Sequence, residues 1–254
     1  MPISLADYER RVPEAVARFW ATRTQASAAQ LARGVTDAGT RGAVTGGKAM
    51  DGFVDLVRAV VVENGLSAAE VYASLQDKGP NRHTVLPGFY RPVKDWDLVV
   101  IHQGRLVAAL EFKSQGGSFG NNANNRAEEA IGMGKDLRVA FRTGLLGPPP
   151  KPFVGYLMLL EDAPGSRRAV GDTSRHFGTD PVFRGASYAR RYEVLCRRLV
   201  AEELYTSAAL LLSSAEAGPA GSYTELGPET GVQQLLATLA GHVASAAAWP
   251  ATIA

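Results

Sequence analysis

The amino-acid sequence predicts an α/β fold in which helices flank a mixed β-sheet. Three observations lead to this prediction. Short runs rich in Val, Leu and Ala alternate along the chain with longer segments whose apolar residues recur at helical spacing. Gly-, Pro- and Asn-rich stretches separate these segments. Their order, helix, strand, strand, helix, strand, helix, strand, is typical of a sheet with helices packed against it.

The first third of the chain is predicted to be mainly helical. An apolar stripe at helical spacing runs from Phe53 to Val61 and stops at Asn64–Gly65, a pair that commonly ends helices. The predicted elements are a helical N-terminal segment at about 4–33, a Gly/Thr-rich loop at 34–50, a helix at 51–63, a short strand at 68–75 and a proline-broken loop at 76–92.

The remaining two thirds are predicted to alternate between strands and helices. Asn125 is expected to cap a helix that Gly144 closes. The predicted elements are a β-hairpin of 96–101 and 105–115, a polar loop at 116–125, a helix at 126–142, a stiff connector at 145–152, a strand at 153–161, a helix at 188–205, a strand at 207–214 and a C-terminal helix at about 230–248.

The composition is that of a globular protein. The 254 residues are 46% apolar and 20% charged, which suits a single domain, 1–254, that buries a core without cross-links. One cysteine, Cys196, excludes an internal disulfide and fits a reducing cytoplasm. The N-terminus lacks the apolar stretch of a signal peptide, and no run is long enough for a membrane span. We therefore expect a cytoplasmic protein without a membrane partner.

Asp97, Glu111 and Lys113 place three charged groups beside the two apolar runs of the hairpin at 96–115. Glu111 and Lys113 share one face of their strand because side chains alternate across a strand. A two-residue turn at Gln103–Gly104 would set Asp97 opposite Leu110, on the other face. A three-residue turn, or a β-bulge near Asp97, would bring the two carboxylates to the same face. We predict one of these two irregularities.

Carboxylates that converge on one face form a hard-oxygen site suited to Mg²⁺. The peptide carbonyl of Phe112 is a natural further ligand. Asp95 lies two residues before Asp97, so it would face the same side of the strand, and it is the fallback ligand if Asp97 does not bind the metal. Such a metal acidifies water in phosphodiester hydrolysis, and Lys113 can orient or deprotonate that water. The alternative interpretation is an ordinary solvated hairpin end with a Glu–Lys pair.

Asp97 and "Glu111-Phe112-Lys113" together have the form of the PD-(D/E)xK nuclease motif. The stretch "KDWDLVVIHQGRLVAALEFKSQGGSFGNNANNRAEEAIGMGKDL" resembles the XhoI-type type II restriction endonucleases, as do "GGKAMDGF", "LPGFYRP", "PFVGYLMLLEDAP" and "GASYARRYEVLC". The similarity spans roughly 42–239. Trp96 departs from the wider superfamily, in which many members carry Pro before the Asp.

This resemblance implies a restriction-endonuclease-like mixed central sheet flanked by helices. It also implies a homodimeric, Mg²⁺-dependent type II endonuclease that cuts double-stranded DNA at 5′-CTCGAG-3′ after the first C. Carried over by position, Asp97 and Glu111 would hold the metal, and Lys113 would assist the attacking water. A cognate DNA methyltransferase is expected in the same system, without direct contact, because a restriction enzyme requires protected host DNA.

Side chains suited to DNA recognition gather in two segments. Asn and Gln pair well with adenine, whereas Arg suits guanine and phosphate. The candidates after the catalytic strand are Gln115, Asn121, Asn122, Asn124, Asn125 and Arg126, and those in the arginine-rich stretch 164–198 are Arg184, Arg190 and Arg191. For any single Asn, a turn or cap role is the alternative. The roles of Asp51, Asp55 and Glu128, as further site residues or as acids near helix N-termini, are left open.

Two other functions are compatible with the pattern. One is a structure-specific repair or recombination nuclease of the same fold, which would cut by DNA shape rather than by sequence. The other is a DNA-binding module that has lost the chemistry. The complete set of Asp97, Glu111 and Lys113 argues against the second.

Overall fold

A five-stranded mixed β-sheet forms the centre of the computed structural model, which describes residues 2–32, 48–74, 76, 79 and 82–249. Its strands, in spatial order, are β1 (Val71–Ala73), β4 (Leu98–His102), β5 (Arg105–Gln115), β6 (Phe153–Glu161) and β7 (Ser207–Ser213). Strand β4 is antiparallel to β1 and to β5, whereas β6 and β7 continue the sheet in parallel with β5. The predicted α/β class with a mixed sheet is therefore confirmed.

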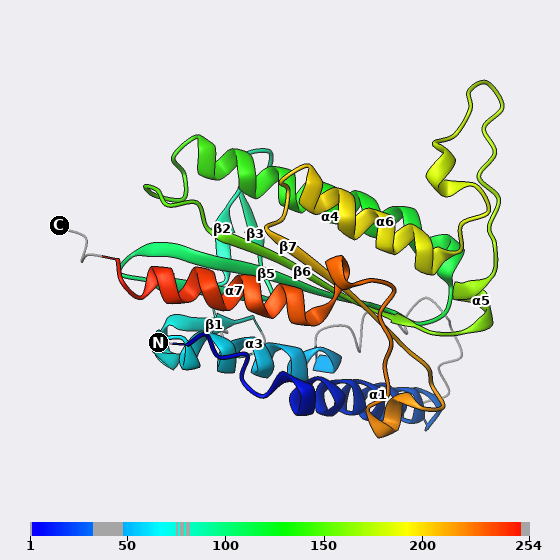
Figure 1. Ribbon diagram of the computed structural model, residues 1–254, viewed down its shortest axis with the longest axis horizontal. Helices are drawn as coiled ribbons and strands as arrows, with labels where there is room; N and C mark the ends of the chain where they lie inside the picture. Colours follow the sequence, from blue (N-terminus) through cyan, green and yellow to red (C-terminus); the bar gives the residue numbers. More distant parts are fainter. Residues whose placement is uncertain (1, 33–47, 75, 77–78, 80–81, 250–254) are drawn as a thin grey trace.

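Helices cover both faces of the sheet (Figure 1). One face carries α1 (Tyr8–Ala32), α3 (Asp51–Glu63) and α7 (Val232–Ala246), and the other carries α4 (Phe119–Arg142) and α6 (Tyr188–Ala201). Single turns of helix lie at Ala68–Glu70, Pro164–Arg167 (α5), Pro181–Phe183, Gly218–Ala220 and Pro228–Thr230. Within the described residues, no helix is both long and apolar enough to cross a membrane.

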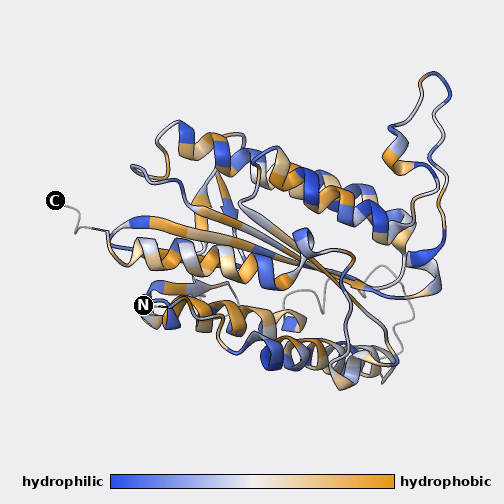
Figure 2. Ribbon diagram, in the orientation of Figure 1, coloured by the Kyte–Doolittle hydropathy of each residue, from blue (hydrophilic) through white to orange (hydrophobic). Residues whose placement is uncertain are grey.

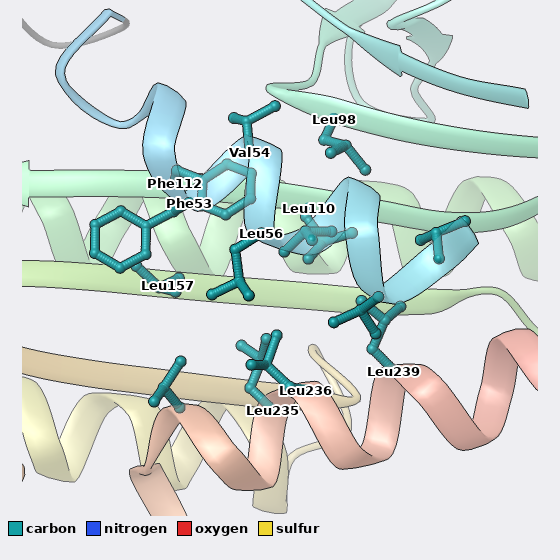
Figure 3. Packing of buried hydrophobic residues seen from close by; sticks show 14 of the residues in the cluster. Phe53, Val54, Leu56, Leu98, Leu110, Phe112, Leu157, Leu235, Leu236 and Leu239 are labelled. Carbon is teal, nitrogen blue, oxygen red and sulfur yellow. The ribbon is translucent and has the colours of Figure 1, made fainter. Parts of the chain in front are cut away.

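Two apolar cores hold these layers together. Figure 2 shows apolar residues along the sheet and polar residues along the outer sides of α4 and α6. The core under α3 and α7 is drawn in Figure 3, with Phe53, Val54 and Leu56 from α3, Leu235, Leu236 and Leu239 from α7, and Leu98, Leu110, Phe112 and Leu157 from the sheet. The core under α4 and α6 includes Trp96, Tyr156, Tyr192, Cys196 and Tyr205. Because side chains alternate, each central strand contributes to both cores.

Several predicted elements agree closely with the structure. The helix at 51–63 and the strand at 153–161 have the predicted bounds, and the last strand and last helix differ from theirs by one or two residues. Helix α6 ends at Ala201 rather than at 205, and the predicted loop at 76–92 contains a short strand. That strand, β2 (Val85–Pro87), pairs with β3 (Val93–Asp95) as a separate ribbon. Most of the predicted loop at 34–50 lies outside the described residues.

The start of α4 is the main correction. The sequence predicts a loop through Asn125, but the helix begins at Phe119. Phe119 stacks on Tyr188 of α6, with 6.2 Å between ring centroids, and the side-chain amide of Asn122 lies 3.3 Å from the carbonyl oxygen of Ser118. Packing against α6 thus outweighs the low helix propensity of the Asn- and Gly-rich segment.

The crossing of α1 and α3 provides a test of how closely the layers pack. A Cβ at Gly52 would lie 2.7 Å from Cα of Ala15. Because Cα of Ala15 is a backbone atom, this clash could be relieved only by moving one of the two helices. We expect Gly52→Ala to lower the free energy of unfolding by about 1–3 kcal/mol, because overpacking outweighs the gain in helix propensity. Urea unfolding measures the change.

Gly132 is the matched control, because it is exposed on α4 and a Cβ there would meet no atom within 4 Å. Gly132→Ala should raise the free energy of unfolding by about 0.5–1 kcal/mol. A stabilising effect of both substitutions would contradict the tight crossing.

Candidate active site

A β-bulge brings Asp97 and Glu111 to the same face of the sheet. The hairpin turn has only two residues, Gln103 and Gly104, both with positive φ. Ile101 pairs with Leu106, but Val100 pairs with Ala108, so Val107 is an extra residue in β5. Beyond this shift Leu98 pairs with Leu110, which sets Asp97 opposite Glu111. Of the two predicted irregularities the bulge is therefore the one observed, three residues along β4 from Asp97.

Asp97 is held against β5 by a backbone hydrogen bond. The amide of Phe112 donates to Oδ2 of Asp97 at 2.7 Å. Burial raises the pKa of Asp97 to about 6, and the negative charge of Glu111 acts in the same direction. Lys113, the Phe112 amide and Lys94 oppose this rise in pKa. Asp97 and Glu111 thus repel each other, as expected of carboxylates arranged to share a cation.

Glu111 is 2% exposed and lies between two ammonium groups. Nζ of Lys113 donates to Oε1, and Nζ of Lys94 donates to Oε2 at 2.9 Å. Glu111 points away from α3 and α7, because its cross-strand neighbour Tyr156 belongs to the core under α4 and α6. The site therefore lies on the same side of the sheet as α4 and α6.

Lys113 is charged in this arrangement. Burial by itself would lower the pKa of Lys113, but the hydrogen bond and charge of Glu111, together with the charge of Asp97, raise it. A cationic ammonium can orient water and balance phosphate charge, whereas a neutral amine would be needed to accept a proton. The structure thus favours the first of the two roles that the sequence allows.

The donor set fits a hard divalent cation. Asp97 and Glu111 offer carboxylate oxygens, and the Phe112 carbonyl faces the same strand edge as its amide, since a strand residue directs both groups to one neighbour. Within the part of the chain that the structure describes, no cluster of three or more His, Cys, Asp or Glu could hold a metal. Two carboxylates with a carbonyl suit Mg²⁺, which keeps several waters, better than Zn²⁺.

Asp95 is engaged elsewhere. Its Oδ1 accepts from the Thr84 hydroxyl at 2.7 Å, and its Oδ2 lies 2.6 Å from the Arg82 guanidinium. These contacts fix the end of β3 beside the site. The fallback carboxylate thus serves the β2–β3 ribbon rather than the pair formed by Asp97 and Glu111.

The β2–β3 ribbon also bridges the sheet and α4 (Figure 1). Asp136 of α4 accepts from the amides of Phe89 and Tyr90 at 2.7 and 2.8 Å, and from Arg91 Nε at 2.7 Å. Although burial acts to raise the pKa of Asp136, these hydrogen bonds lower it. The turn between β2 and β3 is therefore tied to α4 by three hydrogen bonds, and Lys94 of β3 reaches Glu111.

Lys94 was missed by the sequence interpretation. It stands three residues before Asp97, at the start of the long matching stretch "KDWD", so the signal was visible. Its contact with Glu111 depends on the separate β2–β3 ribbon, whose first strand lies in the segment 76–92 that the sequence predicts as a loop. Apart from this proximity to Asp97, local pattern gives no reason to place Lys94 at the site.

The predicted DNA-contact residues after β5 separate into two groups. Gln115 is 5% exposed; it accepts from the Tyr192 hydroxyl and its amide lies 3.3 Å from the Phe119 carbonyl oxygen, so it joins β5, α4 and α6. The other group lies on the first turns of α4, where Asn121, Asn124 and Asn125 are exposed and Asn122 and Arg126 are half-buried. Arg126 pairs with Glu129 at 2.7 Å, and its charge acts on the pKa of Lys113.

The arginines of the second segment differ in their surroundings. Arg184 is exposed and directly follows the single turn Pro181–Phe183. It belongs to the loop between α5 and α6, which projects from the body of the protein (Figure 1). Arg190 pairs with Glu193 at 2.5 Å. Arg191 donates to the carbonyls of Val170 and Gly171 and so fixes the base of that loop.

The acids whose roles were left open lie apart from the carboxylate pair or at the surface. Asp51 and Asp55 are on α3, across the sheet from Glu111, where they lie 3.4 and 2.7 Å from Arg18 of α1. Glu128 is exposed on α4. The structure thus does not bring Asp51 or Asp55 to the site.

Comparison with known proteins identifies close relatives. The sequence profile of the family described as Restriction endonuclease XhoI matches residues 29–225. The type II restriction enzyme XhoI of Xanthomonas vasicola is 50% identical over 202 residues, covering 79% of this chain and 78% of its own. BstVI of Geobacillus stearothermophilus is 44% identical over 84% of this chain and 94% of its own. AbrI of Azospirillum brasilense is 51% identical over 70% of this chain and 77% of its own. No solved structure matches the chain at a significant level.

The raised pKa of Asp97 predicts a pH-dependent change in stability. With a folded pKa of about 6 against an ordinary value of 3.8, the folded state binds the extra proton, so stability falls as pH rises through this window. We expect metal-free Asp97→Asn to be more stable than the wild type at pH 8 by up to about 3 kcal/mol, and the difference to shrink towards pH 4. Urea unfolding in EDTA measures it.

Asp55→Asn is the control for this experiment, because Asp55 is an exposed acid away from the site. Equal or lower stability of Asp97→Asn at pH 8 would show that the Asp97 carboxylate is not electrostatically strained.

Proposed function

The chain belongs to the XhoI family of restriction endonucleases, and we propose that it is a type II enzyme that hydrolyses double-stranded DNA with Mg²⁺ at the palindrome 5′-CTCGAG-3′, after the first C. The observation that carries the chemistry is the bulge-dependent pairing of Asp97 with Glu111, next to Lys113. The target sequence rests on the family resemblance.

The site residues divide the reaction among them. Asp97, Glu111 and the Phe112 carbonyl would hold the cation. A bound Mg²⁺ supplies Lewis-acid chemistry, in that it acidifies water and stabilises negative charge on phosphate oxygens. Lys113, held at the site by Glu111, orients the attacking water and balances the charge of the phosphate. In-line attack then leaves a 5′-phosphate and a 3′-hydroxyl.

DNA recognition is assigned mainly to the first turns of α4. Only three residues separate the end of β5 from the start of α4, and Arg126 acts electrostatically on Lys113, so this part of α4 lies near the scissile phosphate. Exposed Asn121, Asn124 and Asn125 have the paired donors and acceptors that read adenine. Arg184 suits phosphate, and so does Arg126, whose partner Glu129 is an exposed residue of the same helix. Gln115, Asn122, Arg190 and Arg191 have intramolecular partners and would position these segments.

The assembly follows from the symmetry of the target. A palindrome suits a homodimer in which each subunit reads one half-site and cuts one strand. Residues 1–254 would act as a single endonuclease domain in the cytoplasm. A cognate methyltransferase would protect host DNA at the same sequence without contacting this chain.

Removal of any one of the three motif side chains tests the chemistry. We expect Asp97→Ala, Glu111→Ala and Lys113→Ala each to lower the cleavage rate at least about 10³-fold, or ~4 kcal/mol of transition-state stabilisation. Sequence-specific binding in Ca²⁺ should remain. Asp55→Asn is the control, since Asp55 lies across the sheet and should leave cleavage unchanged. Cleavage at near-normal rate by any of the three variants would refute the assignment.

Digestion of a mapped plasmid tests the specificity. With Mg²⁺ we expect discrete fragments whose sequenced ends lie after the first C of each CTCGAG, and with Ca²⁺ no cleavage. Fragmentation without regard to sequence would favour the structure-specific nuclease. A protein that binds this site but never cuts it would be the silent DNA-binding module.

A further inference from the structure

Lys94 is a second lysine at the carboxylate pair, and the nuclease motif does not include it. Its Nζ lies 2.9 Å from Oε2 of Glu111, while Lys113 binds Oε1 of the same carboxylate. The two ammonium groups thus engage both oxygens of Glu111. Lys113 comes from the same strand as Glu111, whereas Lys94 reaches it from the separate β2–β3 ribbon.

The position of Lys94 is built by the fold. Its side chain is 16% exposed, and Nζ also donates to the carbonyl of Asp95. The ammonium lies 5.1 Å from the ring centroid of Trp96, which is 1% exposed. Asp95 and Asp136 fix the two ends of the ribbon, as described above. Lys94 is therefore directed at Glu111 and is not a mobile surface lysine.

The side chains at the site have balanced formal charges. Asp97 and Glu111 contribute two negative charges, and Lys94 and Lys113 contribute two positive charges. A cation bound to a Glu111 oxygen would repel the ammonium group that is hydrogen-bonded there, and this repulsion favours displacement of that ammonium. A displaced and largely buried ammonium needs another anion, because an unpaired buried charge is strongly unfavourable. The phosphate of bound DNA is the anion that the proposed reaction brings to this place.

We propose that Lys94 is the counter-ion of Glu111 in the metal-free enzyme and transfers to a phosphate oxygen of DNA when the divalent cation and DNA are bound. This inference rests on the proposed nuclease function. A flexible ammonium with three donors suits such a transfer. Lys94 then offsets the repulsion between Asp97 and Glu111 before the cation binds, and it later contributes to DNA binding.

Metal binding without DNA distinguishes this role from a merely structural one. If Lys94 competes with the cation, Lys94→Met should bind Mn²⁺ more tightly than the wild type, on the order of 10-fold, because one positive charge is removed from the site. If Lys94 only orders Glu111 as a ligand, the same variant should bind Mn²⁺ more weakly. Titration of DNA-free protein, followed by the electron paramagnetic resonance of free Mn²⁺, gives the sign.

Three variants make the titration interpretable. Lys94→Arg keeps the charge and should retain wild-type Mn²⁺ affinity. Lys94→Gln removes the charge but keeps a polar group, and it should tighten Mn²⁺ binding even if Met disturbs folding. Lys151→Met removes a half-exposed lysine from the connector before β6, and its affinity should equal that of the wild type.

DNA binding in Ca²⁺ tests the second half of the transfer. The slope of log Kd against log salt concentration should be smaller for Lys94→Met by about one phosphate contact. An unchanged slope, or unchanged or weaker Mn²⁺ affinity in both charge-removing variants, would overturn the role of Lys94 alone. If Glu111→Gln binds Mn²⁺ as the wild type does, the metal site itself is wrong, and both proposals are overturned.

Discussion

The pairing of Asp97 with Glu111 is the constraint on which the site depends. Strand side chains alternate with a period of two, so a shift of one residue moves a side chain to the opposite face. With the observed two-residue turn alone, Asp97 would face the core of α3 and α7 beside Leu110. The extra residue Val107 in β5 corrects the register. A backbone irregularity, and not an unusual side chain, thus makes the carboxylate pair.

Burial makes the negative charges of this carboxylate pair unfavourable unless cations compensate them. Glu111 is almost fully buried and the pKa of Asp97 is raised by desolvation, so two nearby carboxylates are tolerated only with compensating cations. Lys94 and Lys113 both pair with Glu111 and provide two such cations. Lys113 lies on β5, the strand that also carries Glu111, and Lys94 lies on β3 of the neighbouring β2–β3 ribbon. The same electrostatic demand that favours a divalent cation therefore explains the second lysine.

Helix α4 joins the carboxylate pair to the surface that we propose for DNA recognition. Its first turns follow β5 almost directly, and Gln115 and Phe119 hold them against α6. Farther along, Asp136 holds the turn of the ribbon that carries Lys94. One helix thus presents the exposed asparagines and supports the ribbon at the active site. Rigid attachment to the sheet fixes both relative to Glu111.

Patterns in the amino-acid sequence were sufficient to predict the α/β class, the bounds of α3 and β6, and the motif of Asp97, Glu111 and Lys113, because alternation and helical periodicity are local properties of the chain. They also limited the hairpin to two irregularities. The folded structure was needed to show that the bulge is the one that occurs, that α4 begins at Phe119, and that Lys94 contacts Glu111. These outcomes depend on contacts between residues distant in sequence, whose packing and charge outweigh local propensity.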